Sequence, residues 1–258
     1  MRKATNKNWQ RVTAAAAALA LCAGVLTGCG ASSSTAAGST AASSAAASEV
    51  SSEEADEMAA KNVADLIDAI YVQERNENTD AQCEAAKAAW DALTDAQKEM
   101  VEGEEADPDY FGRDTGDASK DDARNQDNIG DKEILVVSFG TSFNDSRAAD
   151  IKGIEDAIQA AYPDWSVRRA FTAQIIINHV QARDGEKIDN MEQALERAVA
   201  NGVKDLVVQP THLMHGAEYD EMMEMVDSYR DQFESVAIAE PLLGEVGSDC
   251  LLYTSPSP

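Results

Sequence analysis

Two of the three histidines in this chain lie close together, directly after an apolar run. His212 and His215 follow Leu206-Val207-Val208, a run typical of a buried strand, which stops at Pro210. Ligand sites in open α/β sheets lie just past the carboxyl ends of the strands. An imidazole there can bind a divalent metal or carry a proton near neutral pH. The alternative is that one histidine only caps the following helix, and for His215 both interpretations stay open.

Two other polar loops are expected at the same edge of the sheet. One follows the apolar run Ile134-Leu135-Val136-Val137, and the other places Glu240 after the run Val236-Ala237-Ile238. Parallel strands bring their carboxyl ends together. One imidazole from the loop of His212 and His215, together with the carboxylate of Glu240, forms a partial ligand set for a divalent metal. So small a set suits transfer of a labile ion better than storage. The first loop supplies the candidate ligand-binding residues Ser138, Phe139, Gly140 and Thr141.

Strands and helices alternate from residue 132 to residue 249, which indicates an α/β fold with a mostly parallel sheet. The spacing of apolar residues and caps predicts strands over 134–137, 167–171, 206–208 and 236–238. Helices are expected over 144–162, from 172 onward, over 190–201 with Asp189 as cap, and over 217–233. This length is enough for one compact domain.

The preceding residues divide into a small helical module and an acidic linker. Residues 58–103 show helical periodicity and two candidate capping boxes, Thr79 to Gln82 and Thr94 to Gln97. No titratable cluster stands out there, so we expect a spacer or docking role. Residues 104–131 are rich in Asp, Gly and Asn and are expected to form a mobile acidic linker.

The two ends of the chain carry processing signals. Residues 1–28 combine basic residues with an apolar run and are typical of a secretory signal. Leu26-Thr27-Gly28-Cys29 resembles the lipobox of bacterial lipoproteins, which implies a lipidated Cys29 and an exported protein anchored to the outer face of the cell membrane. Residues 29–57 are expected to be a flexible Ala/Ser tether. Residues 250–258 look like an artefactual tail, which favours a truncated chain over a genuine disordered one.

Composition and missing motifs exclude several functions. A formal net charge of −26 disfavours binding to nucleic acid. The chain has no Walker motif, no dinucleotide glycine fingerprint and no nucleophile elbow. An NTPase, a dehydrogenase and an α/β-hydrolase are therefore disfavoured, and no nucleotide is expected. Once the signal is removed and Cys29 is lipidated, Cys83 and Cys250 remain, too few for a disulfide framework.

Several motifs, in order, resemble the anaerobic cobalt chelatase family (sirohydrochlorin cobaltochelatase) over residues 132 to about 244. They are Phe139 to Ser142, Ala170 to Ile176, Arg183 to Gly185, Gln209 to His212 and Gly216 to Tyr219. The resemblance implies two similar α/β lobes around a tetrapyrrole cleft. It also implies insertion of Co²⁺, with Fe²⁺ as the alternative metal, without ATP and on the route to cobalamin.

Carried over, His212 matches the family's first-lobe metal histidine, and Glu240 is the candidate acidic ligand. The family's second histidine belongs to a second lobe that this sequence does not reach. A non-catalytic, lipid-anchored protein that binds a metal or a tetrapyrrole for uptake is the competing interpretation, and an interaction module with inert histidines is a third. His179, on a predicted helix, is expected to be a structural or a surface residue.

Overall fold

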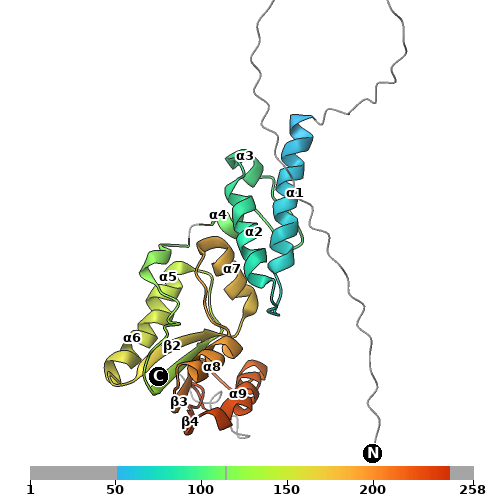
Figure 1. Ribbon diagram of the computed structural model, residues 1–258. Coiled ribbons are helices and arrows are strands. Elements are labelled where there is room, and N and C mark those ends of the chain that lie inside the picture. The colour runs from blue at the N-terminus through green and yellow to red at the C-terminus, as the bar shows by residue number, and fades with distance from the viewer. Residues whose placement is uncertain (1–50, 114, 245–258) are drawn as a thin grey trace, which may run out of the picture. The chain divides into compact units, whose positions relative to one another are not determined.

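The computed structural model describes residues 51–113 and 115–244 of the chain. The predicted signal, Cys29, most of the predicted tether and the tail 250–258 lie outside the described residues. Figure 1 shows a bundle of N-terminal helices followed by a sheet with helices around it. We call residues 51–113 the helical region and residues 132–244 the α/β lobe. No helix in the described ranges is both long and apolar enough to span a membrane.

The α/β lobe contains a parallel sheet with the strand order β2-β1-β3-β4. This confirms the predicted α/β class. The strands are β1 (Lys132–Ser138), β2 (Ser166–Phe171), β3 (Asp205–Pro210) and β4 (Ser235–Ile238). The helices are α5 (Asn144–Ser146), α6 (Lys152–Ala161), α7 (Gln174–Asp184), α8 (Met191–Ala200) and α9 (Ala217–Tyr229). A π-helical turn, Arg147–Ile151, joins α5 to α6, and a 3-10 turn, Arg230–Gln232, follows α9.

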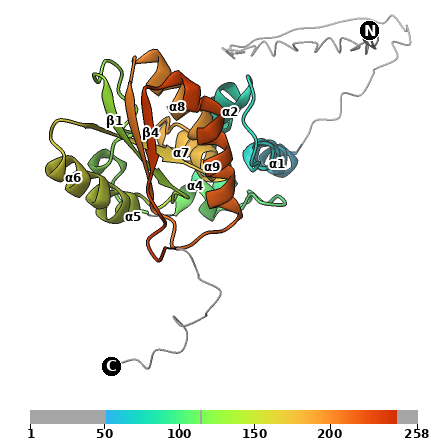
Figure 2. The same cartoon turned by 90° about the horizontal axis from the view of Figure 1, so that it is seen from below.

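Helices cover both faces of the sheet, because alternate residues of a strand point to opposite sides. Leu135 and Val137 of β1 belong to a core cluster that includes residues of α8 and α9. Ile134 and Val136 belong to a second cluster, against which Ile158 of α6 packs. Figure 2 shows α8 and α9 on one side of the strands and α6 on the other. A strand buried on both faces explains the continuous apolar run of β1.

Buried ion pairs flank β2 on both faces. Arg168 and Arg169 are adjacent in sequence and both fully buried. Arg168 binds Asp189 at 3.2 Å, whereas Arg169 binds Glu155 of α6 and Asp121 at 2.7 Å each. Asp189 therefore serves as an ion-pair partner and not as the predicted helix cap. The cap of α8 is Asn190, which forms a capping box with the first turn.

The helical region consists of α1 (Ser52–Ile70), α2 (Thr79–Asp91), α3 (Asp95–Lys98) and α4 (Asp109–Gly112). A capping box between Ser51 and Glu54 starts α1, so the helix begins six residues before the predicted module. The predicted capping box at Thr94 is confirmed. The one at Thr79 is wrong, because Thr79 lies inside the first turn of α2 and its hydroxyl accepts from the amide of Asn76.

The predicted acidic linker packs against the lobe. A short 3-10 helix, Ala118–Lys120, precedes Asp121, whose fully buried carboxylate contacts Arg147 at 3.0 Å and Arg169 at 2.7 Å. Burial raises the pKa of Asp121, but these two guanidinium groups bring it below its usual value. Tyr110 and Phe111 are also buried. The expectation of a mobile linker is therefore wrong for this stretch, because buried partners outweigh its polar composition.

The helical region docks on α7 of the α/β lobe. The buried Asn178 side chain donates to the backbone oxygen of Ile70, at the end of α1, at 2.9 Å. The thiol of Cys83 on α2 lies 3.6 Å from the backbone oxygen of the same Asn178. Ala182 of α7 belongs to the same core cluster as the buried residues of α1 and α2. The helical region and the lobe thus share one hydrophobic core in this part of the structure.

Candidate functional site

The loops after β1 and β3 meet at the carboxyl edge of the sheet, as predicted. The amide of Thr211 donates to Val137, and the Thr211 hydroxyl donates to the Ser138 hydroxyl at 3.0 Å. The loop after β4 joins them, because the amide of Leu242 donates to the backbone oxygen of His212 at 2.9 Å. These bonds place His212 among three loops that follow three parallel strands.

The two ring nitrogens of His212 are buried and have no hydrogen-bond partner among the described residues. The side chain of His212 is 10% exposed. The nearest acid is Glu218, whose carboxylate lies 3.7 Å from Nε2, beyond hydrogen-bond distance. Burial lowers the pKa of His212, and the negative charge of Glu218 opposes that shift. The lowered pKa favours the neutral ring, which is the form that binds metals or accepts a proton.

His215 and Glu240 form a separate, more exposed pair. Their side chains are 34% and 67% exposed, and Nε2 lies 3.2 Å from the carboxylate. The centroid of the Tyr219 ring lies 4.4 Å from that of His215 and 6.4 Å from that of His212. The structure therefore pairs Glu240 with His215 and places Glu218 beside His212, an acid that the sequence reasoning did not select. Its signal was its position in the first turn of α9, within the Gly216 to Tyr219 motif.

The loop after β1 is held by its own backbone and by β2. The backbone oxygens of Ser138 and Phe139 accept from Thr172 and Ala173, the two residues that follow β2. The Thr141 hydroxyl accepts from the amide of Phe143. Ser138 is buried, whereas the Phe139 ring is 46% exposed and is free to contact a ligand.

Gly140 is required by the close approach of this loop to β2. Its φ of +100° lies in the region that favours glycine, and a Cβ there would come within 2.5 Å of the Phe171 ring. Any side chain at this position would push the loop away from the end of β2. Gly140 therefore allows the loop to lie close to the end of β2, beside the site.

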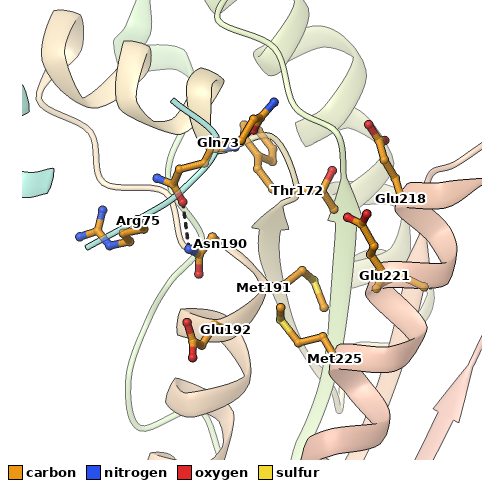
Figure 3. A pocket seen from close by; sticks show the side chains of 12 residues that line it. Gln73, Arg75, Thr172, Asn190, Met191, Glu192, Glu218, Glu221 and Met225 are labelled. Atoms are coloured by element: carbon orange, nitrogen blue, oxygen red, sulfur yellow. Dashed lines mark hydrogen bonds between the residues drawn. The ribbon is translucent and has the colours of Figure 1, made fainter. Parts of the chain in front are cut away.

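A cavity of about 240 Å³ opens beside the end of β2, and Figure 3 shows the side chains around it. Thr172 directly follows β2, Asn190 and Glu192 come from the start of α8, and Glu218 and Glu221 come from α9. Glu218 is common to the cavity and to the surroundings of His212. It lines the cavity, and its carboxylate lies closest to the imidazole. The cavity is smaller than the roughly 300–1,000 Å³ of typical small-molecule pockets.

Within residues 51–113 and 115–244, no group of three His, Cys, Asp or Glu side chains is arranged to hold a metal ion. His212 with Glu218, and His215 with Glu240, are therefore pairs of donors. A pair leaves most of the coordination sphere of a divalent ion open to water or to a second ligand.

Of the two environments expected for His179, structural or surface, the structure shows the structural one. Its ring stacks on Tyr110 with centroids 4.0 Å apart, and Nε2 lies 2.6 Å from the backbone oxygen of the same residue. Burial, with a contribution from the charge of Arg183, lowers its pKa to about 4. The imidazole is therefore neutral and serves as part of the joint between the helical region and α7.

Comparison with known proteins agrees with this geometry. Residues 132–251 match the family model described as cobalt chelatase (CbiK). The chain is 38% identical over 112 residues to a protein from Salmonella typhimurium named sirohydrochlorin cobaltochelatase, with 43% of this chain and 42% of that protein covered. It is 28% identical over 118 residues to sirohydrochlorin cobaltochelatase CbiKC from Nitratidesulfovibrio vulgaris, covering 45% of this chain and 41% of that one.

The match thus spans less than half of the length of these curated relatives. It begins at β1 and contains the loops that surround His212, whereas the helical region lies outside it. Over these residues the α/β segment of this chain is similar to the cobalt chelatase family.

Proposed function

We propose that the protein acts as a chelatase of the sirohydrochlorin cobaltochelatase type, which inserts Co²⁺ into a tetrapyrrole without ATP. The observation that carries the proposal is the buried, unpartnered imidazole of His212 at the carboxyl edge of a lobe that matches the cobalt chelatase family. A buried polar group without a partner is costly. A ligand bound to a ring nitrogen would supply the missing contact.

The residues at this edge suit the chemistry of metal insertion. Insertion removes two pyrrole protons and replaces the metal's water ligands with ring nitrogens. The neutral imidazole of His212 can hold the incoming ion or accept a proton, and its lowered pKa keeps it neutral for either role. The carboxylate of Glu218, 3.7 Å away, can balance the positive charge of the ion.

His215 and Glu240 have a second, outer role in this proposal. Their pair is partly exposed, so its electrostatic attraction is screened by solvent. Such a pair is suited to attract a cation from solution and to pass it on to the buried imidazole. Glu240 stays a candidate metal ligand together with His215, and the exposed Phe139 is positioned to contact the face or edge of a ring.

We also propose that the protein is exported and anchored to the outer face of the membrane by lipid on Cys29. The support is the sequence of the first 29 residues, with basic residues, an apolar run and Leu26-Thr27-Gly28-Cys29. Radiolabelled fatty acid is expected on the wild type and not on Cys29→Ala. Equal labelling of both proteins would refute the anchor without affecting the proposed chemistry.

The proposed activity is tested by mixing the protein with Co²⁺ and sirohydrochlorin and by following the absorbance of the ring. We expect metal insertion faster than in the protein-free control, and no effect of added ATP. Tight binding of the ring without acceleration would refute the chelatase and favour a binding protein for uptake. If the protein neither binds the ring nor accelerates insertion, the remaining interpretation is an interaction module.

A further inference from the structure

We propose that the helical region contributes a carboxylate-recognition site to the cavity, in which Arg75 receives an acidic substituent of the ligand. This inference deepens the proposed function, because a tetrapyrrole with acidic side chains is the ligand it concerns. It assigns a binding role to a residue outside the segment that matches the cobalt chelatase family.

The loop between α1 and α2 forms one wall of the cavity. Gln73 and Arg75 of this loop line it together with residues of β2, α8 and α9. Figure 3 shows Arg75 on the side of the cavity opposite Glu218 and Glu221. The helical region therefore completes a space that the α/β lobe alone would leave open.

Charge is distributed unevenly around the cavity. Among its lining residues Arg75 is the one basic side chain, whereas Glu192, Glu218 and Glu221 are acidic. The acids on α9 lie at the end nearest His212, because Glu218 contacts both regions. A cation is thus favoured at the His212 end, and an anionic group can find a counter-charge only at Arg75. A ring that carries carboxylates on its periphery and takes a metal at its centre fits this arrangement.

Arg75 is held in place before any ligand arrives. Its Nη2 lies 2.5 Å from the carboxylate of Asp80, which also accepts from Gln181 at 3.0 Å and Lys187 at 3.2 Å. The Arg75 side chain is 20% exposed, so most of it is fixed while part stays accessible. Arginine carries five N–H donors, and the bond to Asp80 leaves others for a ligand carboxylate.

A chain of amide side chains fixes the rest of this wall to the lobe. The Gln73 side-chain oxygen accepts from the backbone amide of Gln174, the first residue of α7. The Gln174 side chain donates to Asn178 at 2.8 Å and accepts from Asn190 at 2.9 Å. Asn178 in turn donates to Ile70. This relay joins the end of α1, the start of α7 and the cap of α8, so the helical region and two walls of the cavity are positioned as one unit.

The test measures binding of metal-free uroporphyrin, a carboxylate-rich porphyrin, to the full chain by fluorescence. We expect Arg75→Gln to weaken binding about tenfold, the usual effect of losing one charged hydrogen bond, and Arg75→Lys to weaken it less. Added salt is expected to weaken binding to the wild type more than to Arg75→Gln. Binding of Co²⁺ alone should be the same in both proteins.

Two control variants separate recognition from structure and from net charge. Asp80→Asn breaks the same ion pair but keeps the guanidinium, so uroporphyrin should bind at least as tightly as to the wild type. Lys87→Gln removes a positive charge that pairs with Asp91 elsewhere on α2, and it should change binding by less than about twofold. Thermal melts show whether each variant is folded.

The proposal is overturned if Arg75→Gln binds uroporphyrin as the wild type does, or if Asp80→Asn weakens binding as much as Arg75→Gln does. The result that would reject the role of Arg75 differs from the result that would reject the proposed function. Insertion of Co²⁺ with a KM for sirohydrochlorin unchanged in Arg75→Gln rejects only the role of Arg75. Absence of insertion together with weaker porphyrin binding by Arg75→Gln rejects only the chelatase.

Discussion

His179 and His212 are both shielded imidazoles with lowered pKa values, but their surroundings differ in one respect. His179 stacks on Tyr110 and bonds to its backbone oxygen, so its polar group is satisfied within the fold. His212 has no hydrogen-bond partner in the described part of the chain, and its nearest acid is 3.7 Å away. Burial alone therefore does not distinguish the two histidines, whereas the missing hydrogen-bond partner of His212 does.

The two sites also contribute to different properties of the molecule. The contacts of His179 join the helical region to α7, which makes it part of the shared core. The loop of His212 lies at an open edge, where the neighbouring Leu213 and Met214 are exposed. We expect changes at His179 to affect stability and changes at His212 to affect chemistry.

The largest expected effect is on activity. His212→Ala should reduce the rate of Co²⁺ insertion by at least about 100-fold, because it removes the group that we propose to hold the ion or accept the proton. The free energy of unfolding should change by less than about 1 kcal/mol, since no hydrogen bond is lost. Absorbance kinetics and urea unfolding measure the two effects. An insertion rate near that of the wild type would remove His212 from the site.

A change at His179 is expected to lower the stability of the protein and to leave its binding of Co²⁺ unchanged. His179→Ala loses the stacked ring and the bond to Tyr110 and leaves a cavity between the helical region and α7. Its free energy of unfolding should fall by about 2–4 kcal/mol, measured in urea. The folded fraction should still bind Co²⁺ with unchanged affinity. A stability equal to that of His212→Ala would show that the two histidines do not differ as described.

Acid pH should destabilise the protein through His179. Its pKa is about 4 in the folded chain and 6.5 in an unfolded one, so between these values the unfolded state binds more protons. The free energy of unfolding should therefore fall as the pH drops from about 6.5 to 4, by about 2 kcal/mol after allowance for partial exposure of the ring. His179→Phe should flatten this part of the pH profile, and a slope equal to that of the wild type would contradict the assignment.

The smallest effects are expected at the exposed pair. Glu240→Gln should change stability by less than about 0.5 kcal/mol, because its partner His215 is partly solvent-exposed. Calorimetric titration should show that Glu218→Gln weakens Co²⁺ binding more than Glu240→Gln does. The reverse order would restore Glu240 as the main acidic ligand and His215 as its partner.

The sequence predicted the strands and helices of the lobe better than it predicted the contacts that other parts of the chain make with the lobe. The apolar run of β1 and the alternation of strands and helices were sufficient for a parallel sheet, because both signals are local. The same alternation placed His212 and the Ser138 loop at one edge, which the bond between Thr211 and Ser138 confirms.

Contacts between residues far apart in sequence could not be predicted in this way. Asp121 lies in an acidic stretch that is typical of a solvent-exposed linker, but two arginines of the lobe bury its carboxylate. Arg75 had no distinguishing feature until the fold placed it beside the cavity. Glu218 was passed over for a similar reason, because its closeness to His212 depends on how the loop returns to α9.

The central claim is that His212 is the histidine that meets the metal. The chain has three histidines, so their ring signals can be assigned by NMR with one variant for each. Titration with Co²⁺, a paramagnetic ion, should broaden the ring signals of His212 first, those of His215 to a smaller extent, and those of His179 not at all. Broadening that spares His212 while it removes the signals of His215 or His179 would contradict the account.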